Sequence, residues 1–350
     1  MKVLITGTNG FIAQNLRIHL SERSDVEVVC FTRIQSIEEL EQLLDQVDFV
    51  FHLAGVNRPD NNIEFEIGNE SLTRDLCALI ESSGRKIPVI FSSSIQAQSD
   101  TPYGKSKQAA ETALIEFYEK TDSPIYIFRL TNVFGKWCKP NYNSVVATFC
   151  HNVANDLSIE IHNANANLNL VHIGAVVTSF IKTMMTRPKN SIQVNVEPIY
   201  QVTLGELAEM LQSYKNSRKT LVTEEVGDGF NRVLYATYIS YITPSDFNYP
   251  LTKHEDPRGV FVEMLKTKKS GQFSFFTAHP GITRGGHYHH CKTEKFLVIK
   301  GKARFGFRHI VTNEACEIFT NGDTPEIVET VPGWSHDVTN VGDDELVVML

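Results

Sequence analysis

The sequence has no apolar run long enough to cross a bilayer, no basic cluster and no closely spaced pair of cysteines. A membrane-spanning helix needs about 20 consecutive, mainly apolar residues, so we expect no membrane insertion. The segment 1–7 passes directly into a short apolar strand and lacks the cationic region, the longer apolar stretch and the cleavage site of a signal peptide. We therefore expect a cytoplasmic protein.

The shortage of positive charge argues against a nucleic-acid-binding protein, and the lack of paired cysteines argues against a disulfide-rich or zinc-thiolate protein. A formal net charge of −8 without a basic cluster argues against a nucleic-acid-binding groove and favours a small-molecule partner. The cysteines have no C-x-x-C spacing, so the sequence predicts reduced thiols rather than a disulfide framework or a thiolate zinc site. They are Cys30, Cys77, Cys138, Cys150, Cys291 and Cys316.

The chain of 350 residues is longer than one hydrophobic core usually organises, which predicts two domains. In its first part, short β-branched or apolar runs alternate with helical patterns, as in βαβ units with a parallel sheet covered on both faces. Ser36 and Glu39 have the spacing of a capping box and predict a surface helix over 36–46. The expected strands are 2–6, 26–31, 48–53, 88–93 and 125–130.

The character of the sequence changes in the turn-rich, proline-containing segment 242–250. Beyond it, strand-like runs separated by glycine-rich or polar turns predict an all-β sandwich or small barrel. We therefore expect an α/β, Rossmann-type doubly wound domain over 1–243 and an all-β domain over 244–350. The strands expected in the second domain are 259–265, 272–278, 295–300 and 303–310.

A glycine-containing loop directly follows the first strand. Gly7 and Gly10 permit a tight turn and a close approach of backbone amides to a pyrophosphate, and the small Ala13 lets the next helix pack on the strand. An ordinary strand-to-helix turn is the alternative, but strand and helix both occur where dinucleotide binding requires them. Arg33 follows the second strand, where an acidic residue would select NAD. Its guanidinium instead suits the extra phosphate of NADP, unless it is only a solvated loop arginine.

A serine triplet and a Tyr-x-x-x-Lys pair supply groups for proton transfer to a carbonyl. Tyr103 and Lys107 share one helical face, and the ammonium would favour the phenolate form of the tyrosine. A serine of the run 92–94, at the adjacent strand end, would hydrogen-bond the substrate oxygen. Taken singly, each feature is common on exposed helices or strand ends. Together, on a phosphate-loop fold, they indicate carbonyl reduction.

Over roughly its first two-thirds the chain resembles the extended short-chain dehydrogenase/reductases. Further similar strings are His52-Leu-Ala-Gly55, Asn69-x-x-Leu-Thr73, Arg129-Leu-Thr-Asn132-Val-Phe-Gly135 and Leu170-Val-His172-Ile. Ala13 and Gly174-Ala175 depart from the family pattern, which has a glycine and commonly an aspartate there. The resemblance implies that Ser94 positions the carbonyl, Tyr103 supplies the proton and Lys107 also holds the nicotinamide ribose. It implies cofactor contacts from Gly7, Asn9, Gly10, Phe11, Ile12, Arg33, Leu53, Ala54, Gly55, Tyr103 and Lys107.

Three histidines and a carboxylate in the second half have the spacing of a mononuclear metal site. His287 and His289 would project from one face of a strand, and neighbouring strands would add Glu294 and His336. His290 would point to the opposite face as a surface residue. The spacing resembles the two motifs of cupins, which implies a cupin barrel with these four ligands. Zinc is the expected ion, although iron, manganese and nickel suit the same ligand types.

A reductase followed by a cupin resembles the bifunctional capsular-polysaccharide enzymes of the CapF/WbjC family, which also belong to lipopolysaccharide clusters. The similar strings include Ser92-Ser-Ser-Ile-Gln-Ala97, Phe134-Gly-Lys-Trp-Cys-Lys-Pro-Asn-Tyr-Asn-Ser144 and Glu294-Lys-Phe-Leu-Val298. The resemblance implies a homodimer acting on a UDP-4-keto-6-deoxy-N-acetylhexosamine. The cupin would epimerise carbon 3, with His309 among the candidate bases, and the reductase would reduce carbon 4 with NADPH. The product would be UDP-N-acetyl-6-deoxy-L-talosamine, on the route to UDP-N-acetyl-L-fucosamine.

Two other functions remain open on the sequence. The cupin could be a non-catalytic sugar-binding or dimerising module, in which case carbon 3 would exchange no hydrogen with heavy water. A non-enzymatic NADP sensor is the second alternative, and the intact Tyr103 and Lys107 pair argues against it.

The sequence ends at Leu350 within an expected strand, whereas the resembled family continues for a short tail. We expect either a truncated chain or a last strand that is supplied differently.

Overall fold

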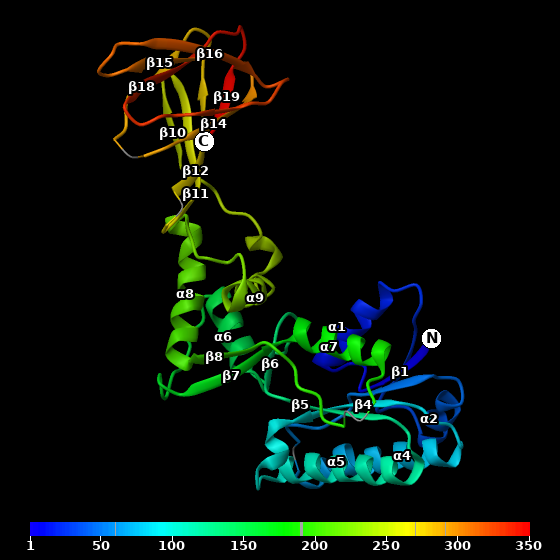
Figure 1. The fold of residues 1–350 in the computed structure, drawn as a ribbon. Helices are drawn as coiled ribbons and strands as arrows, with labels where there is room; N and C mark the ends of the chain where they lie inside the picture. Colours follow the sequence, from blue (N-terminus) through cyan, green and yellow to red (C-terminus); the bar gives the residue numbers. More distant parts are fainter. Residues whose placement is uncertain (60, 190–191, 270, 291) are drawn as a thin grey trace. The chain divides into compact units, whose positions relative to one another are not determined.

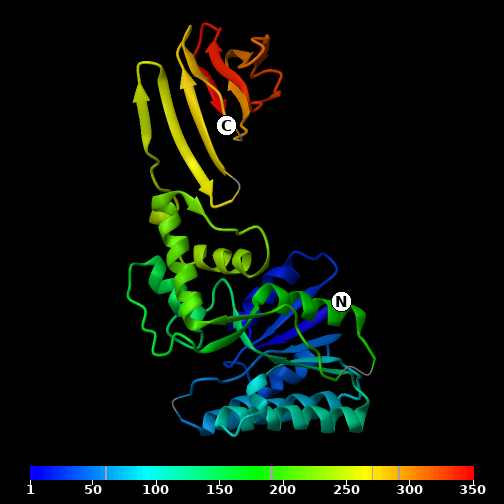
Figure 2. The same cartoon turned by 60° about the vertical axis from the view of Figure 1, so that its left-hand side comes forward.

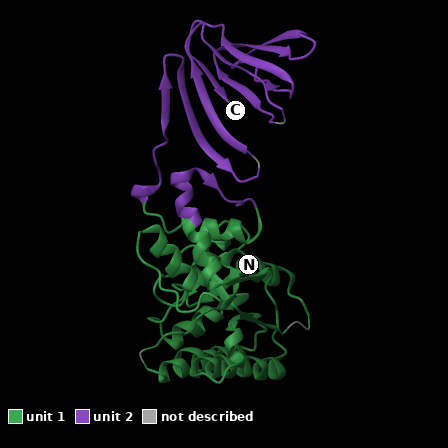
Figure 3. Ribbon diagram, turned by 90° about the vertical axis from the view of Figure 1, so that its left-hand side faces the viewer, with its two compact units in different colours: residues 1–212, 228–243 green, residues 213–227, 244–350 purple. Residues whose placement is uncertain are grey.

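The computed structural model of the chain describes residues 1–59, 61–189, 192–269, 271–290 and 292–350. The chain divides into two compact units, shown in different colours in Figure 3. The N-terminal unit comprises residues 1–212 and 228–243, and the C-terminal unit comprises residues 213–227 and 244–350. The segment 213–227 thus belongs to the C-terminal unit although it precedes the boundary expected at 243.

The N-terminal unit is built on a five-stranded parallel sheet. Its strands have the order β2-β1-β3-β4-β5, and every neighbouring pair is parallel. All four residues of β3 are buried, as expected for a strand in a sheet that is covered on both faces. The strands are β1 (Lys2–Thr6), β2 (Glu27–Phe31), β3 (Phe49–His52), β4 (Val89–Ser94) and β5 (Ile125–Leu130).

Helices cover both faces of this sheet (Figure 1). On one face α1 (Phe11–Ser21) and α7 (Ile173–Thr186) bury one hydrophobic cluster. On the other face α2 (Ile37–Leu44), α4 (Leu72–Ser82) and α5 (Pro102–Thr121) bury a second cluster. The doubly wound α/β fold predicted from the sequence is therefore confirmed.

The N-terminal unit also contains a second sheet and further helices. A second sheet has the order β6-β7-β8, with β6 (Asn132–Phe134), β7 (Asn167–His172) and β8 (Ile199–Thr203). The short helices are α3 (Ile63–Phe65), the π-helix η1 (Glu66–Ser71) and the 3-10 helix η2 (Ile95–Gln98). The longer ones are α6 (Val145–Ala154), α8 (Leu204–Thr220), which continues into the C-terminal unit, and α9 (Gly229–Ile239).

The C-terminal unit consists mainly of two antiparallel sheets that enclose one hydrophobic core (Figure 2). One sheet has the order β10-β11-β12-β19-β14-β17, with β9 (Val222–Thr223) pairing β11, and the other β13-β18-β15-β16. The core draws side chains from both sheets, which confirms the predicted all-β fold. The strands are β10 (Lys253–Asp256), β11 (Gly259–Thr267), β12 (Gly271–Ala278), β13 (Thr283–His287), β14 (Lys295–Lys300), β15 (Lys302–His309), β16 (Ala315–Asn321), β17 (Ile327–Glu329), β18 (Trp334–Asn340) and β19 (Leu346–Met349), and η3 (Pro244–Asp246) precedes them.

The last strand, β19, pairs with both β12 and β14 in the interior of its sheet, so this chain itself supplies it. Within the described residues, no helix is both long and apolar enough to span a membrane. Five cysteines carry free thiols, and Cys291 lies outside the described residues.

Candidate functional site

A cavity of about 1280 Å³ opens along the carboxyl ends of the parallel strands in the N-terminal unit. In open α/β sheets, ligands bind at this edge. All eleven residues expected to contact a cofactor line the cavity, and Ser94 lines it as well. The structure therefore brings the sequence-predicted residues of this unit together in one place.

The loop after β1 can be made only with glycine at its first position. Gly7 has a φ of +66°, and a Cβ atom there would lie 2.6 Å from the Cα atom of Ala54. The amide of Gly10, the N-cap of α1, donates to the carbonyl of Gly7 at 2.9 Å. The first-turn amides of α1 lack intrahelical acceptors and border the cavity, which suits a phosphate group. The hydroxyl of Thr8 stabilises the loop by donating to the carbonyl of Phe31 at 3.0 Å. The sequence did not indicate this residue.

Two exposed arginines line the cavity, Arg33 after β2 and Arg58 after β3. The sequence pointed to Arg33 through its place at the end of the second strand. Arg58 was missed, because it belongs to a polar loop that carries no recognisable spacing. Both guanidinium groups are available for an anionic ligand.

Tyr103 lies in the first turn of α5, whose N-cap Thr101 accepts a hydrogen bond from Gly104. Burial raises the pKa of the Tyr103 hydroxyl, and a hydrogen bond with Ser94 acts in the opposite direction. Burial has the larger effect, so this pKa is raised overall, whereas the sequence predicted that Lys107 would lower it. The hydroxyl of Ser93 instead donates to Glu111 at 2.5 Å, so Ser94 is the serine bonded to Tyr103.

Lys107 is a buried ammonium held by its neighbours from strand β4. Its Nζ atom donates to the carbonyl of Ser92 at 3.0 Å and lies 4.7 Å from the centre of the Phe91 ring. Burial lowers its pKa to about 8, and the charge of Glu111 opposes that shift. Glu111 is itself buried and pairs with Arg129 at 2.6 Å. The sequence could have indicated Glu111, because it lies one helical turn after Lys107.

A buried hydrogen-bond chain connects the first strand to helix α5. Burial lowers the pKa of His52 to about 3, so its imidazole is neutral. Thr73 donates to the carbonyl of Asn69 at 2.6 Å, so its oxygen accepts from Nε2 of His52 at 2.9 Å. Nδ1 of His52 then accepts from Thr6 at 2.8 Å. The amide of Asn69 donates to Ser106 in α5 at 2.9 Å, which completes the connection.

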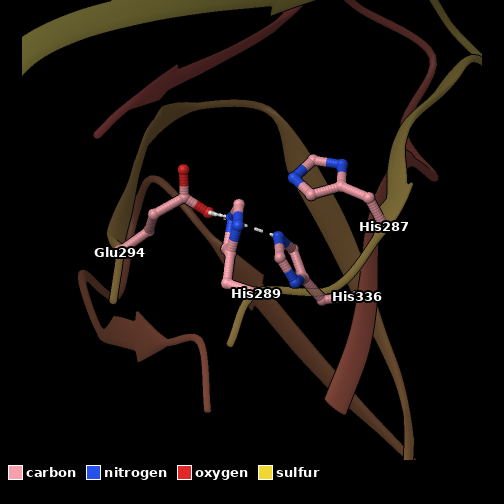
Figure 4. Close-up of side chains that lie close together, drawn as sticks. All are labelled: His287, His289, Glu294 and His336. Atoms are coloured by element: carbon pink, nitrogen blue, oxygen red, sulfur yellow. Dashed lines mark hydrogen bonds and ion pairs between the residues drawn. The ribbon is translucent and has the colours of Figure 1, made fainter. Parts of the chain in front are cut away.

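The four residues expected to bind a metal also meet, in the C-terminal unit (Figure 4). One potential ligand atom from each of His287, His289, Glu294 and His336 lies within 4.8 Å of all the others. Oε2 of Glu294 lies 3.1 Å from Nε2 of His289 and 3.3 Å from Nε2 of His336. Burial lowers the pKa of His336, which favours the neutral imidazole that a metal ligand requires. The donor set fits zinc and the other divalent ions expected from the sequence.

One detail of this cluster differs from the expectation. Strand β13 ends at His287, so His289 reaches the cluster from the following loop rather than from the same strand. The two imidazole rings still lie 4.9 Å apart. His290 is exposed, as expected for a residue outside the ligand set. His309 has its Nδ1 atom occupied, because it accepts from the amide of Thr312 at 3.1 Å.

Comparison with known proteins gives matches to both parts of the chain. The NAD dependent epimerase/dehydratase family matches residues 3–196, and the polysaccharide biosynthesis C-terminal domain matches residues 254–350. A Pseudomonas aeruginosa protein named UDP-2-acetamido-2,6-beta-L-arabino-hexul-4-ose reductase is 59% identical over all of this chain and 94% of its own length. A mouse dTDP-D-glucose 4,6-dehydratase is 22% identical over 71% of this chain and 81% of its own length.

Among solved structures, the capsular polysaccharide assembling protein CapF of Staphylococcus aureus is similar throughout. It aligns with a TM-score of 0.92 at 38% identity and covers all of this chain and 95% of its own. The family carries a nicotinamide cofactor in its name, and the cavity described above has the loop and the helix N-terminus that such a cofactor needs. The chain is thus an enzyme of the NAD dependent epimerase/dehydratase family, in the CapF group, and it continues into a polysaccharide biosynthesis C-terminal domain.

Proposed function

We propose that the N-terminal unit reduces the carbon 4 ketone of a UDP-4-keto-6-deoxy-N-acetylhexosamine with NADPH, after the C-terminal unit has inverted carbon 3. The product would be UDP-N-acetyl-6-deoxy-L-talosamine, on the route to UDP-N-acetyl-L-fucosamine. The observation that carries the reductase part is the bonded pair of Ser94 and Tyr103 beside Lys107 in the cavity. The name of the Pseudomonas aeruginosa relative supports the same substrate class.

The side chains in the cavity suit proton delivery to a ketone. The cofactor would supply hydride to carbon 4, and the hydroxyl of Tyr103 would give its proton to the carbonyl oxygen. A raised pKa keeps Tyr103 protonated at neutral pH, as a proton donor must be. Ser94 would hold the same oxygen through its hydroxyl, and Lys107 would hold the nicotinamide ribose. The positions of these side chains in one cavity support the proposed reduction.

The choice of NADPH over NAD rests on the cationic lining of the cavity. Arg33 follows β2, where the ribose of a dinucleotide lies in this fold, and Arg58 adds a second positive charge to the same cavity. A 2′-phosphate would accept charge-assisted hydrogen bonds from such groups.

We also propose a cytoplasmic homodimer, and a single-chain mass by light scattering of the full chain would contradict the dimer.

In the C-terminal unit, His287, His289, Glu294 and His336 would hold a divalent ion, which we propose to be zinc. When bound, the ion would supply a positive charge for polarising an oxygen or bracing the fold. Epimerisation requires a base to remove the carbon 3 proton while the electron pair moves onto the carbon 4 oxygen. His309 is a candidate with its Nε2 atom, since Nδ1 accepts backbone hydrogen bonds.

The proposal is tested by incubating the full chain with the UDP-4-keto sugar in heavy water, with and without NADPH. We expect deuterium at carbon 3 in both cases and reduction of carbon 4 only with NADPH. Tyr103→Phe should lose at least about a hundredfold in reduction rate, the scale of one general acid, and keep the exchange. Loss of both from this one change would contradict separate sites. Reduction without any exchange would favour a C-terminal unit that only binds sugar or dimerises.

A further inference from the structure

The inner face of the C-terminal unit carries an arginine, Arg284, at the start of β13. Arg284 pairs across the strands with Val338, a core residue that is 3% exposed. Directly opposed residues of an antiparallel pair lie on the same face, so the Arg284 side chain points inward. Its guanidinium carbon lies 5.4 Å from the centre of the buried Phe276 ring, and 15% of the side chain is exposed. A permanent positive charge therefore lies inside the sheet pair.

The groups around Arg284 do not fully pair or neutralise its guanidinium. Its Nε atom is buried and has no hydrogen-bond partner among the described residues. Its carboxylate neighbour, Asp256, is 3.9 Å away and is already bonded to Arg258 at 2.6 Å. Two guanidinium groups thus share one carboxylate, and burial lowers the pKa of Arg284. A largely buried cation is unfavourable unless an anion pairs with it, so this interior is suited to an anionic ligand.

A bulge at 285–286 directs Arg284 and His287 to the same interior. Residues three apart in a regular strand face opposite sides, but the register of β13 shifts at this point. Both residues of the bulge are glycines with φ of +92° and +82°, and a Cβ atom on the first would lie 3.0 Å from the carbonyl oxygen of His336. As a result, Arg284 lies opposite Val338 while His287 lies opposite His336. Arg284 and the metal-ligand cluster therefore face one interior.

We propose that Arg284 binds an oxyanion of the sugar nucleotide inside the C-terminal unit. This inference deepens the proposed epimerisation and rests on it. Two oxyanions fit the chemistry: the diphosphate, and the carbon 4 oxygen, which takes up the electron pair when carbon 3 loses its proton and returns it when a proton adds to the other face. A guanidinium binds either through paired charge-assisted hydrogen bonds. His287 is exposed, so the interior is open to solvent on that side.

The test uses the metal-loaded full chain and the UDP-4-keto sugar in heavy water without NADPH. The kcat and KM of deuterium incorporation at carbon 3 are measured for the parent, Arg284→Gln and Arg284→Lys. We expect kcat/KM to fall about a hundredfold for the glutamine variant, the effect of removing one charged donor, and less for lysine. Arg304→Gln is the matched control, because Arg304 lies on the same sheet but is already bonded to Asp337 and Glu317. It should stay within about threefold of the parent.

The kinetic constants also identify the oxyanion. A fall in kcat with unchanged KM assigns Arg284 to the carbon 4 oxygen, whose charge develops in the transition state. A rise in KM, with an equal rise in the inhibition constant of UDP, assigns it to the diphosphate. Parent-like kinetics of a folded Arg284→Gln variant overturn the inference. If that variant does not fold, Arg284→Lys decides, since lysine lacks the forked donors: a loss of about tenfold supports the inference and parent-like kinetics overturn it.

A parent chain that exchanges no hydrogen at carbon 3 would overturn the proposed epimerisation, and the assignment of Arg284 with it. The reductase proposal would be unaffected, because reduction with NADPH is measured separately. If only the assignment of Arg284 is wrong, the parent still exchanges hydrogen at carbon 3 and the Arg284 variants behave like it. The two outcomes are therefore distinguishable.

Discussion

At the scale of single residues, the charge on Lys107 depends on Glu111. Glu111 accepts from Ser93 and pairs with Arg129, so its carboxylate is fixed one helical turn beyond the lysine. Burial lowers the pKa of Lys107 to about 8 while Glu111 raises it. The ammonium is therefore lost at a lower pH than in a free lysine, but at a higher pH than it would be without this carboxylate.

This balance predicts the alkaline limb of the reductase. We expect kcat/KM for the 4-keto sugar to fall as the pH rises through about 8, because Lys107 loses its proton there. Tyr103, whose pKa is raised, stays protonated over the same range. In Glu111→Gln the fall should occur at lower pH, as measured by a pH profile of kcat/KM. Glu116→Gln, on the same helix but largely exposed, should leave the profile unchanged. An unshifted limb in a folded Glu111→Gln variant would contradict this role.

At the scale of elements, the loop between β1 and α1 requires glycine at position 7. The left-handed φ of Gly7 costs about 1 kcal/mol for a residue with a side chain, and the contact with Ala54 at 2.6 Å would displace backbone as well. Gly7→Ala should therefore lower stability by about 2–4 kcal/mol and weaken NADPH binding at least tenfold. Thermal unfolding and a fluorescence titration with NADPH measure the two effects.

A second glycine separates conformational strain from steric contact. Gly84 has nearly the same φ, +65°, but a Cβ atom there would meet no atom within 4 Å. Gly84→Ala should cost only about 1 kcal/mol and leave NADPH binding unchanged. Equal losses in the two variants would mean that the approach of Gly7 to Ala54 has no role.

Elements with local signals were predictable from the sequence, and those that depend on distant neighbours were not. The helix α2 has the capping box expected from Ser36 and Glu39, because both partners lie within one turn. The bulge at 285–286 was not foreseen, since its constraint comes from the backbone of His336, about 50 positions along the chain. The end of β13 at His287 was missed for the same reason. The spacing of the four candidate metal ligands predicted that they would meet, but only the fold shows Arg284 facing the same interior.

At the scale of the whole molecule, each unit has its own hydrophobic core. The two clusters of the parallel sheet draw only on the N-terminal unit, and a third cluster draws only on the C-terminal unit. Separate cores favour separate unfolding transitions. A ligand that binds one native unit should then stabilise that unit by RT ln(1 + [L]/Kd), which is about 2.7 kcal/mol at one hundred times Kd.

This leads to a calorimetric prediction for the zinc-loaded full chain. Two transitions are expected. A chelator should lower the midpoint temperature of one by on the order of 10 °C, and NADPH should raise the midpoint temperature of the other only. His336→Ala should abolish the response to the chelator without changing the response to NADPH, because it removes a buried ligand atom from the cluster. Gly7→Ala should weaken the response to NADPH and leave the response to the chelator unchanged. If the chelator and NADPH moved one common transition, the two ligands would be stabilising a single cooperative unit, and the division of the chemistry between independent halves would be wrong.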